Sequence, residues 1–207
     1  ILIINDGSND SSRMIIEKIS QELPGNLYLI NHQNNEGYGK TLTDGFNYSI
    51  QNNYRFILTI DGDGQHEPEN IDCFIKAMKN STMDIISGSR YLDPGKMATD
   101  PPRDRYHINH TITRIINKIT GYQLTDSFCG FKIYRVNALK KLRLTENGYG
   151  LPLQLLIQAY KSSLKIKELP IELIYTDEKR TFGPVLDDRK KRLHYYMEII
   201  RRELKKT

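Results

Sequence analysis

The chain has 207 residues, of which 38% are hydrophobic and 27% charged, and this composition excludes a disordered or a fibrous protein. Thirty Lys and Arg against 25 Asp and Glu leave a net charge of +5, which suits phosphorylated ligands or an anionic membrane but is too small for a nucleic-acid-binding protein. Only two cysteines are present, which excludes a disulfide scaffold and fits a reducing, cytosolic compartment.

Short apolar runs alternate with longer segments of helical period through the first 90 residues. The runs predict strands, and the segments between them predict crossover helices. Because most of these strands are apolar without alternation, they belong in the middle of a parallel sheet that is covered by helices. The first half is therefore predicted to be a doubly wound α/β unit. Its strands are residues 1–4, 27–30, 56–60 and 84–87, and its helices are residues 11–23, 40–51 and 68–79.

Residues 91–105 differ from what precedes them, because they are rich in Pro, Gly, Asp and Arg. We expect a loop of this length to be a lid that orders over bound substrate. No run reaches the ~20 apolar residues that span a bilayer, so any membrane contact is expected to be peripheral. The later predicted elements are a helix over 106–120, a strand over 131–134, a helix around 151–160, a β-like run over 165–175 and a basic helix over 187–206.

The basic terminal helix carries an apolar stripe at helical spacing. Docking of this stripe on its own domain is the favoured interpretation, and binding to a membrane surface is the alternative. The stripe consists of Leu193, Tyr196, Met197, Ile200 and Leu204.

Two carboxylates separated by one glycine, Asp61 and Asp63, follow the third predicted strand. Ligands of open α/β sheets bind beyond the carboxyl ends of the strands, so these acids lie where a ligand would bind. Side chains two residues apart point the same way, and their oxygens suit Mg²⁺ or Mn²⁺ completed by substrate phosphates. Two unit negative charges ~4 Å apart repel by roughly 4 kcal/mol, so a diphosphate needs that cation. We predict a metal and diphosphate site here, with a plain polar turn as the alternative.

A second polar turn, residues 5–10, follows the first strand and precedes a helix. Its Asp6 can accept hydrogen bonds from a base or ribose edge, and a turn with an N-cap is the alternative. The histidines point to no zinc site, because none has a Cys or His partner at reliable spacing, and His107 with His110 is a poor candidate. Cys129 is expected to be a packed small residue.

Five motifs occur in a fixed order: NDGSND from Asn5, NEGYGK from Asn35, DGDGQH from Asp61, GSRY from Gly88 and TDSFCGFKIYR from Thr125. Together they resemble the family 2 glycosyltransferases of the GT-A fold. The last motif, and the later run ELPI at 168–171, are similar to the dolichyl/polyprenyl-phosphate mannose synthase branch. The resemblance covers residues 1 to about 183 and implies one domain with a Rossmann-like, mostly parallel sheet flanked by helices. Within it, residues 1–90 would be the nucleotide-sugar half and residues 91–183 the acceptor half.

The resemblance implies roles for individual residues. Metal ligands fall on Asp61, Asp63 and Gln65, and nucleotide contacts fall on Asp6, Gly37, Lys40 and Asp61. Acceptor contacts fall on Arg90, Arg114 and Asn117, because Arg114 and Asn117 resemble the stretch whose Arg meets an acceptor phosphate. An Arg fork suits phosphate, although an exposed cation on a helix face is the alternative for Arg114. The residues expected to act in catalysis are Asp63, Arg114 and Asp126.

The chain also departs from the family pattern. Cys129 stands where the branch has Ser, and residues 151–154 replace a segment that carries an acidic residue. The family's first strand is absent, and it would precede Ile1, where the chain opens without Met on an apolar run. We therefore expect a piece of a longer chain whose nucleotide pocket lacks one strand.

The resemblance implies an inverting transfer of a hexose from a nucleoside-diphosphate sugar, such as GDP-mannose or a UDP-hexose. The metal neutralises the leaving group, and positioning and electrostatics supply the rest. The favoured acceptor is a polyprenyl phosphate at the cytoplasmic face of a membrane. This acceptor needs no general base. A sugar hydroxyl is the alternative acceptor, with Asp126 as its base. A non-catalytic nucleotide-binding domain is the third possibility.

Overall fold

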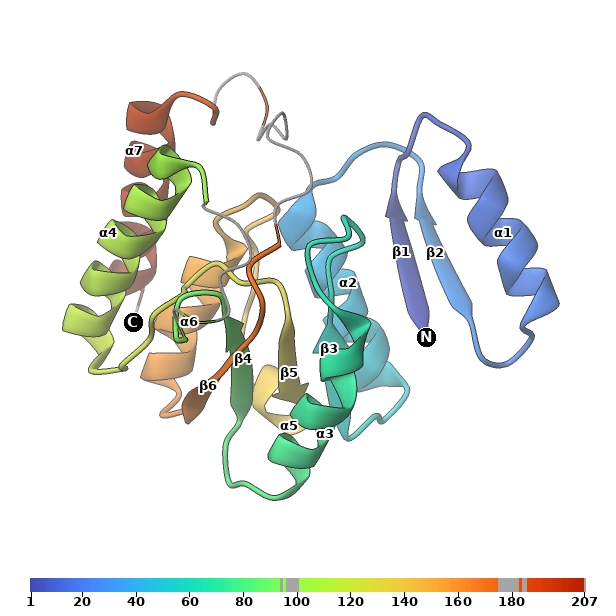
Figure 1. Cartoon of the computed structure of the whole chain (residues 1–207), viewed down its shortest axis with the longest axis horizontal. Coiled ribbons are helices and arrows are strands. Elements are labelled where there is room, and N and C mark those ends of the chain that lie inside the picture. Colours follow the sequence, from blue (N-terminus) through green and yellow to red (C-terminus); the bar gives the residue numbers. More distant parts are fainter. Residues whose placement is uncertain (94, 96–100, 175–182, 184–185, 207) are drawn as a thin grey trace.

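Two sheets lie side by side in the chain, which is described here from a computed structural model (Figure 1). The structure describes residues 1–93, 95, 101–174, 183 and 186–206. The smaller sheet pairs β1 (Leu2–Asp6) with β2 (Tyr28–His32) in parallel, so that Ile4 lies opposite Ile30. Helix α1 (Ser12–Glu22) is the crossover between them, as predicted.

The larger sheet has the strand order β3-β5-β4-β6. Its strands are β3 (Phe56–Thr59), β4 (Ile85–Ser89), β5 (Lys132–Arg135) and β6 (Ile166–Pro170). Strands β4 and β6 are parallel, whereas β5 runs antiparallel to both of its neighbours. The sheet is therefore mixed, and apolar patterning alone did not reveal the reversed strand.

Helices cover both faces of the larger sheet, which explains why β3 and β4 are apolar without alternation. On one face, α3 (Ile71–Lys79) follows a 3₁₀ turn (Pro68–Asn70) and packs Phe74 against Phe131 of the segment that enters β5, with ring centroids 4.7 Å apart. On the other face, α2 (Tyr38–Gln51) and α6 (Leu151–Lys161) bury Phe46 and Leu155 against Ile85. The short helix α5 (Val136–Leu139) joins this face and was not predicted.

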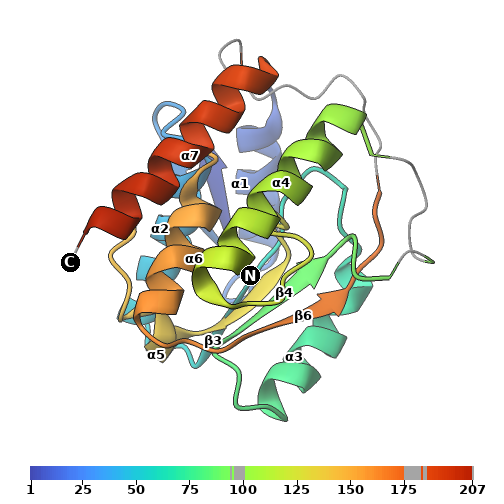
Figure 2. The same ribbon diagram turned by 90° about the vertical axis from the view of Figure 1, so that its left-hand side faces the viewer.

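The terminal helix docks on its own domain, as the favoured interpretation predicted. Helix α7 (Arg189–Lys205) packs beside α4 (Arg103–Thr120) and α6 (Figure 2). Tyr196 and Ile200 of its apolar stripe are buried there, although Leu204 stays exposed. Among the described residues, no helix is long and apolar enough to cross a membrane.

Helix α4 begins earlier than predicted, at Arg103, so the last residues of the expected lid are helical. Residues 94 and 96–100 of that lid lie outside the described residues, and the prediction stays open.

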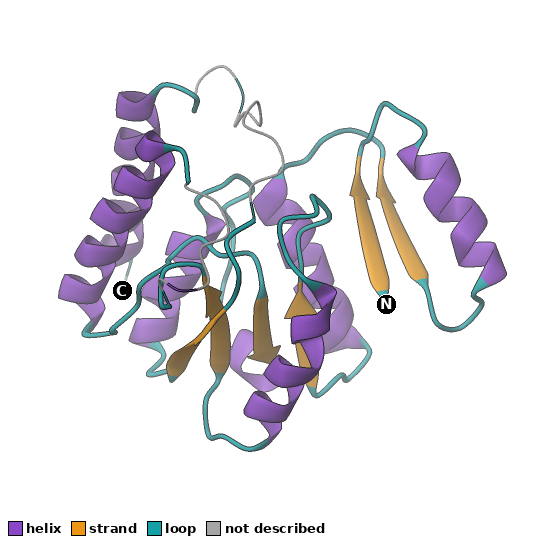
Figure 3. Cartoon of the chain, viewed as in Figure 1, coloured by secondary structure: helices purple, strands orange, loops and turns teal. Residues whose placement is uncertain are grey.

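Strands β1 and β3 each have a hydrogen-bonded neighbour on one side only among the described strands (Figure 3). Helix α2 packs across both of them: a Cβ on Gly45 would lie 3.4 Å from Cδ1 of Ile4 and 3.8 Å from Cδ1 of Ile57. Helix α2 therefore links the two sheets through this contact.

Candidate active site

Asp61 is placed by the end of β3, as the sequence predicted. The strand ends at Thr59, whose hydroxyl donates a 2.7 Å hydrogen bond to the carbonyl oxygen of Gly130. The Asp61 carboxylate packs directly on Gly130, where a Cβ would lie only 2.6 Å from Asp61 Cγ. Glycine at 130 therefore gives the carboxylate its place beside a cavity.

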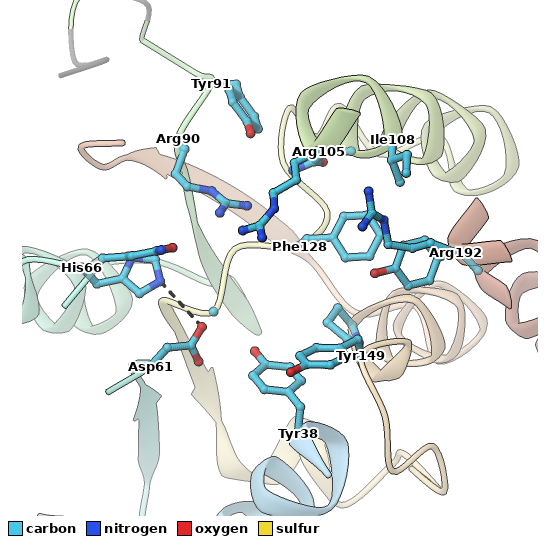
Figure 4. Close-up of a pocket in the computed structure, with 15 residues that line it drawn as sticks. Tyr38, Asp61, His66, Arg90, Tyr91, Arg105, Ile108, Phe128, Tyr149 and Arg192 are labelled. Atoms are coloured by element: carbon cyan, nitrogen blue, oxygen red, sulfur yellow. Dashed lines mark ion pairs between the residues drawn. The ribbon is translucent and has the colours of Figure 1, made fainter. Parts of the chain in front are cut away.

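That cavity opens beyond the ends of β3 and β4 and is lined by acidic, basic and aromatic side chains (Figure 4). Asp61 and His66 face it from one side, and Arg90, Arg105 and Arg192 converge on it from three other elements. Tyr38 and Tyr149 stack on each other with centroids 5.7 Å apart and form another wall. An acidic corner thus faces a basic one across a space with aromatic walls.

The residues after β3 fit a divalent cation by their chemistry. Asp61 and Gln65 line the cavity. The Asp63 carboxylate accepts a 3.0 Å hydrogen bond from the backbone N–H of Gln65, which folds the loop back on itself. The carboxylates of Asp61 and Asp63 and the side-chain carbonyl of Gln65 are the oxygen donors that Mg²⁺ and Mn²⁺ prefer. Within the described ranges there is no group of three or more His, Cys, Asp or Glu side chains that could hold a metal. A cation here would therefore need substrate oxygens to complete its shell.

Arg90 is fixed by the buried carboxylate of Asp126. Its Nε lies 2.7 Å from Asp126 Oδ2 and its Nη2 lies 3.0 Å from Oδ1, which also accepts a hydrogen bond from Asn109. Burial would raise the pKa of Asp126, but the charge and hydrogen bonds of Arg90 outweigh it and hold that pKa far below the usual range. Asp126 therefore fits poorly as the predicted base, because it is buried, ionised and fully engaged.

Glu168, from the ELPI run, supports the same network from β6. Its carboxylate accepts hydrogen bonds from the Thr125 amide at 2.8 Å, the Thr125 hydroxyl at 2.7 Å and the Asp126 amide at 3.0 Å. Asp126 is thereby held at both its backbone and its side chain. The two segments that carried the resemblance, residues 125–135 and 168–171, thus contact each other directly through Glu168.

The residues predicted to touch the nucleotide organise the loop before α2. Asp6 accepts hydrogen bonds from the amides of Glu36 and Gly37 at 2.8 and 2.9 Å, and it pairs with His32. Lys40 pairs with Asp44. Of this region Tyr38, between the predicted Gly37 and Lys40, is the residue that lines the cavity.

Arg114 and Asn117 lie away from the cavity. Arg114 is exposed on α4. The side-chain amide of Asn117 donates a hydrogen bond to the Leu124 carbonyl oxygen and accepts one from the Leu124 backbone N–H. Arg105 lines the cavity instead. The two arginines are nine residues apart, which in a helix of 3.6 residues per turn puts them on opposite faces. Of these two arginines, only Arg105 lines the cavity.

His66 is a cavity residue that sequence reasoning undervalued. Its ring lies edge-on to Phe131, its Nε2 is 3.9 Å from Asp61 Oδ2, and its buried Nδ1 makes no hydrogen bond to the described residues. Burial, with the nearby charge of Arg90, lowers the pKa of His66 to about 4, so the ring is neutral at pH 7. Its position directly after Gln65 in the motif was the available signal. No sequence signal marked Arg192 or Tyr149 as a cavity residue.

A family model for glycosyl transferase family 2 matches residues 1–143. The chain belongs to glycosyl transferase family 2. This membership confirms the resemblance drawn from the five motifs.

Relatives of this transferase include enzymes named for lipid phosphates. It is 30% identical to a UDP-N-acetylglucosamine–dolichyl-phosphate N-acetylglucosaminyltransferase of Methanococcus voltae, over 86% of this chain and 75% of the relative. It is 25% identical to the polyprenol monophosphomannose synthase of Mycolicibacterium smegmatis, over 83% of this chain and 65% of the relative.

The fold matches that of a solved glycosyltransferase. The glucosyl-3-phosphoglycerate synthase of Mycobacterium tuberculosis, crystallised with uridine diphosphate, superposes with a TM-score of 0.71 and covers 98% of this chain and 68% of its own. The sequence identity is 12%, so this likeness shows the GT-A-like fold alone. The same synthase has also been crystallised with Mn²⁺ and uridine-diphosphate glucose.

Proposed function

We propose that this family 2 transferase moves a hexose from a nucleoside-diphosphate sugar to a polyprenyl phosphate, with inversion and with Mg²⁺ or Mn²⁺ bound. One observation carries the proposal: the cavity sets an oxygen-donor corner, Asp61 with Gln65, opposite three arginines. A donor diphosphate and an anionic acceptor need such a pair of subsites close together. The named activities of the relatives point to the same substrate classes.

The donor would lie at the acidic corner. Asp61, Asp63 and Gln65 would hold the cation, which when bound supplies charge neutralisation for the departing diphosphate. The stacked pair of Tyr38 and Tyr149 would flank the donor and exclude water from one side. Residues 1–90 would form the nucleotide-sugar half of a single domain.

The acceptor phosphate would lie at the basic corner, between Arg90, Arg105 and Arg192. Arginine forks bind phosphate through paired donors and keep their charge at any physiological pH. Arg90 and Arg192 are each anchored by a carboxylate, Asp126 and Asp104, so they are positioned before the substrate arrives. A phosphate oxygen is already ionised at pH 7 and attacks without a base, which agrees with the engagement of Asp126.

The exposed face of α7 would bring the enzyme to the cytoplasmic face of a membrane. Seven of the eight Lys and Arg between residues 187 and 206 are exposed, and only Arg192 is buried. Each basic residue near an anionic surface adds about 1 kcal/mol of attraction. The centre of the apolar stripe, Tyr196 and Ile200, is buried in the domain, so this attraction would be mainly electrostatic and sensitive to salt.

A transfer assay tests the proposal. Purified protein, Mn²⁺ and labelled GDP-mannose or a UDP-hexose are incubated with detergent-dispersed polyprenyl phosphate, with a soluble phosphate ester, or with a free sugar. Label that moves into the lipid phase, and only with metal, supports the proposal. Transfer to the free sugar alone would establish the hydroxyl-directed alternative. Metal-dependent binding without transfer or hydrolysis would leave a nucleotide-binding domain.

A further inference from the structure

A five-residue segment, residues 146–150, is wedged between α7 and the start of α2. The carbonyl oxygen of Asn147 accepts hydrogen bonds from the amides of Gly39 at 2.7 Å and Lys40 at 3.3 Å. These amides belong to the first turn of α2, where N–H groups have no partner within the helix. The segment therefore caps the helix that carries Tyr38.

The wedge leaves no slack on either side. A Cβ on Gly39 would lie 2.8 Å from the backbone carbon of Asn147, and one on Gly37 would lie 3.2 Å from the same atom. On the other side, a Cβ on Gly148 would lie 2.6 Å from the hydroxyl of Tyr195 in α7. Backbone packed this closely transmits a displacement of one neighbour to the other.

The carboxylate of Glu146 ties the segment to α7. It accepts a 2.7 Å hydrogen bond from the Tyr195 hydroxyl, a 2.7 Å hydrogen bond from Arg202 and a 3.2 Å hydrogen bond from the Gly148 amide. Burial raises the pKa of Glu146, but the hydrogen bonds from Arg202 and Tyr195 outweigh it and lower that pKa below its ordinary value. The carboxylate is therefore ionised and bonded on both oxygens.

The same segment carries a wall of the cavity. Tyr149 lies between Gly148 and Gly150 and stacks on Tyr38, and both rings line the cavity that holds Asp61 (Figure 4). The Gly150 amide donates to the Tyr195 hydroxyl at 3.2 Å, so Tyr149 is flanked by two residues that α7 contacts. The stacked pair thus depends on Glu146 and Tyr195, which themselves are outside the cavity lining.

We propose that Glu146 is a positioning residue for the donor: by joining Tyr195 and Arg202 of α7 to the segment that caps α2, it sets Tyr38 and Tyr149 for the nucleoside-diphosphate sugar. The inference rests on the proposed function, since it takes the cavity to bind that donor. It names a residue that touches neither substrate and acts through the aromatic wall.

The test substitutes Glu146→Gln, which keeps the shape but turns one oxygen into a donor that faces Tyr195 or Arg202. The dissociation constant of a nucleoside diphosphate with Mn²⁺, measured by calorimetry, should rise between about 5- and 20-fold. The donor KM should rise with it, while the acceptor KM and kcat stay within about twofold. Tyr195→Phe removes the hydrogen bonds of the Tyr195 hydroxyl to Glu146 and to the Gly150 amide but no charge, so it should raise the donor dissociation constant by less.

Arg201→Gln is the matched control. Arg201 is on the same helix but pairs with exposed Glu198 at 2.8 Å, so its loss should leave donor binding unchanged. Unchanged donor binding in both Glu146→Gln and Tyr195→Phe, in a wild type that binds the nucleotide, would overturn this inference alone. A rise in the acceptor KM equal to that of the donor would also overturn it, as general loosening. A wild type that binds no nucleoside diphosphate with metal would overturn the proposed function and this inference together.

Discussion

Replacing Gly130 with Ala should damage donor binding while leaving the fold intact. The new Cβ would lie 2.6 Å from Asp61 Cγ and 2.7 Å from Asp61 Oδ1. To bring Asp61 Cγ to an ordinary contact of 3.4 Å the carboxylate must retreat by roughly 0.8 Å, and Asp61 Oδ2, which lies closer still, must retreat further. The backbone at Gly130 is not in the left-handed region, and what moves is the end of a part-exposed side chain. The cost in stability should therefore stay within about 1 kcal/mol.

A shift of this size is large for a metal ligand. Second-shell changes that reorient a ligand commonly cost about 10- to 100-fold in metal affinity or activity. We expect the dissociation constant of UDP or GDP, measured calorimetrically at saturating Mn²⁺, to rise by about that factor in Gly130→Ala. The melting temperature should fall by no more than roughly 2–4 °C.

Gly62→Ala is the control on the same site. No atom lies within 4 Å of a Cβ at Gly62, and its backbone also has no left-handed φ. It should bind as the wild type does. If Gly130→Ala also binds as the wild type, Asp61 does not hold the metal and the acidic corner has another role.

Three further outcomes are expected. Arg105→Ala should raise the acceptor KM by about 10-fold, whereas Arg114→Ala should leave the acceptor KM within about twofold. If Arg114→Ala raises the acceptor KM and Arg105→Ala does not, Arg114 is the residue that binds the acceptor. Asp126→Asn leaves the part-buried Arg90 guanidinium without its counter-charge and should cost about 3 kcal/mol, or roughly 6–12 °C in Tm. An unchanged Tm would refute that role for the pair. His32 is buried, which lowers its pKa, but hydrogen bonds to Asp6 and Asp44 outweigh this and raise the pKa above 6.5. The stabilisation of the fold by protonated His32 is complete below pH 6.5 and is lost as the pH rises through the pKa that His32 has in the folded protein. Urea unfolding from pH 6 to 9 should show this loss in the wild type and not in His32→Gln.

The order of strands and helices could be predicted because it depends on local patterns. Apolar runs marked β1 to β4, and helical spacing marked α1, α2 and α3. The direction of β5 could not, because a strand buried on both faces is equally apolar whichever way it runs. The four-residue α5 is too short to show a helical period.

The two corners of the site differed in how far sequence could predict them. Asp61 sits at a strand end, and the rule that ligands bind there requires only the strand to be known. The basic corner draws Arg90 from the end of β4, Arg105 from α4 and Arg192 from α7, which are brought together only by packing. The resemblance supplied an arginine on the right helix, but the helical period puts Arg114 on its outer face.

Charge balance gives a physical reason for that distribution. A donor diphosphate and an acceptor phosphate carry several negative charges into one cavity, and each pair of unit charges about 5 Å apart costs about 3 kcal/mol at an effective dielectric of 20. A cation bound to Asp61 and Asp63 can neutralise only the charge of the donor diphosphate. The acceptor side needs guanidinium groups held in place, because mobile ones would lose entropy on binding. Arg90 on Asp126 and Arg192 on Asp104 meet that need: their partners fix each group while leaving donor positions to face the cavity. The buried carboxylate of Asp126 and the half-exposed one of Asp104 are thus better understood as anchors of the basic corner than as acids or bases of the reaction.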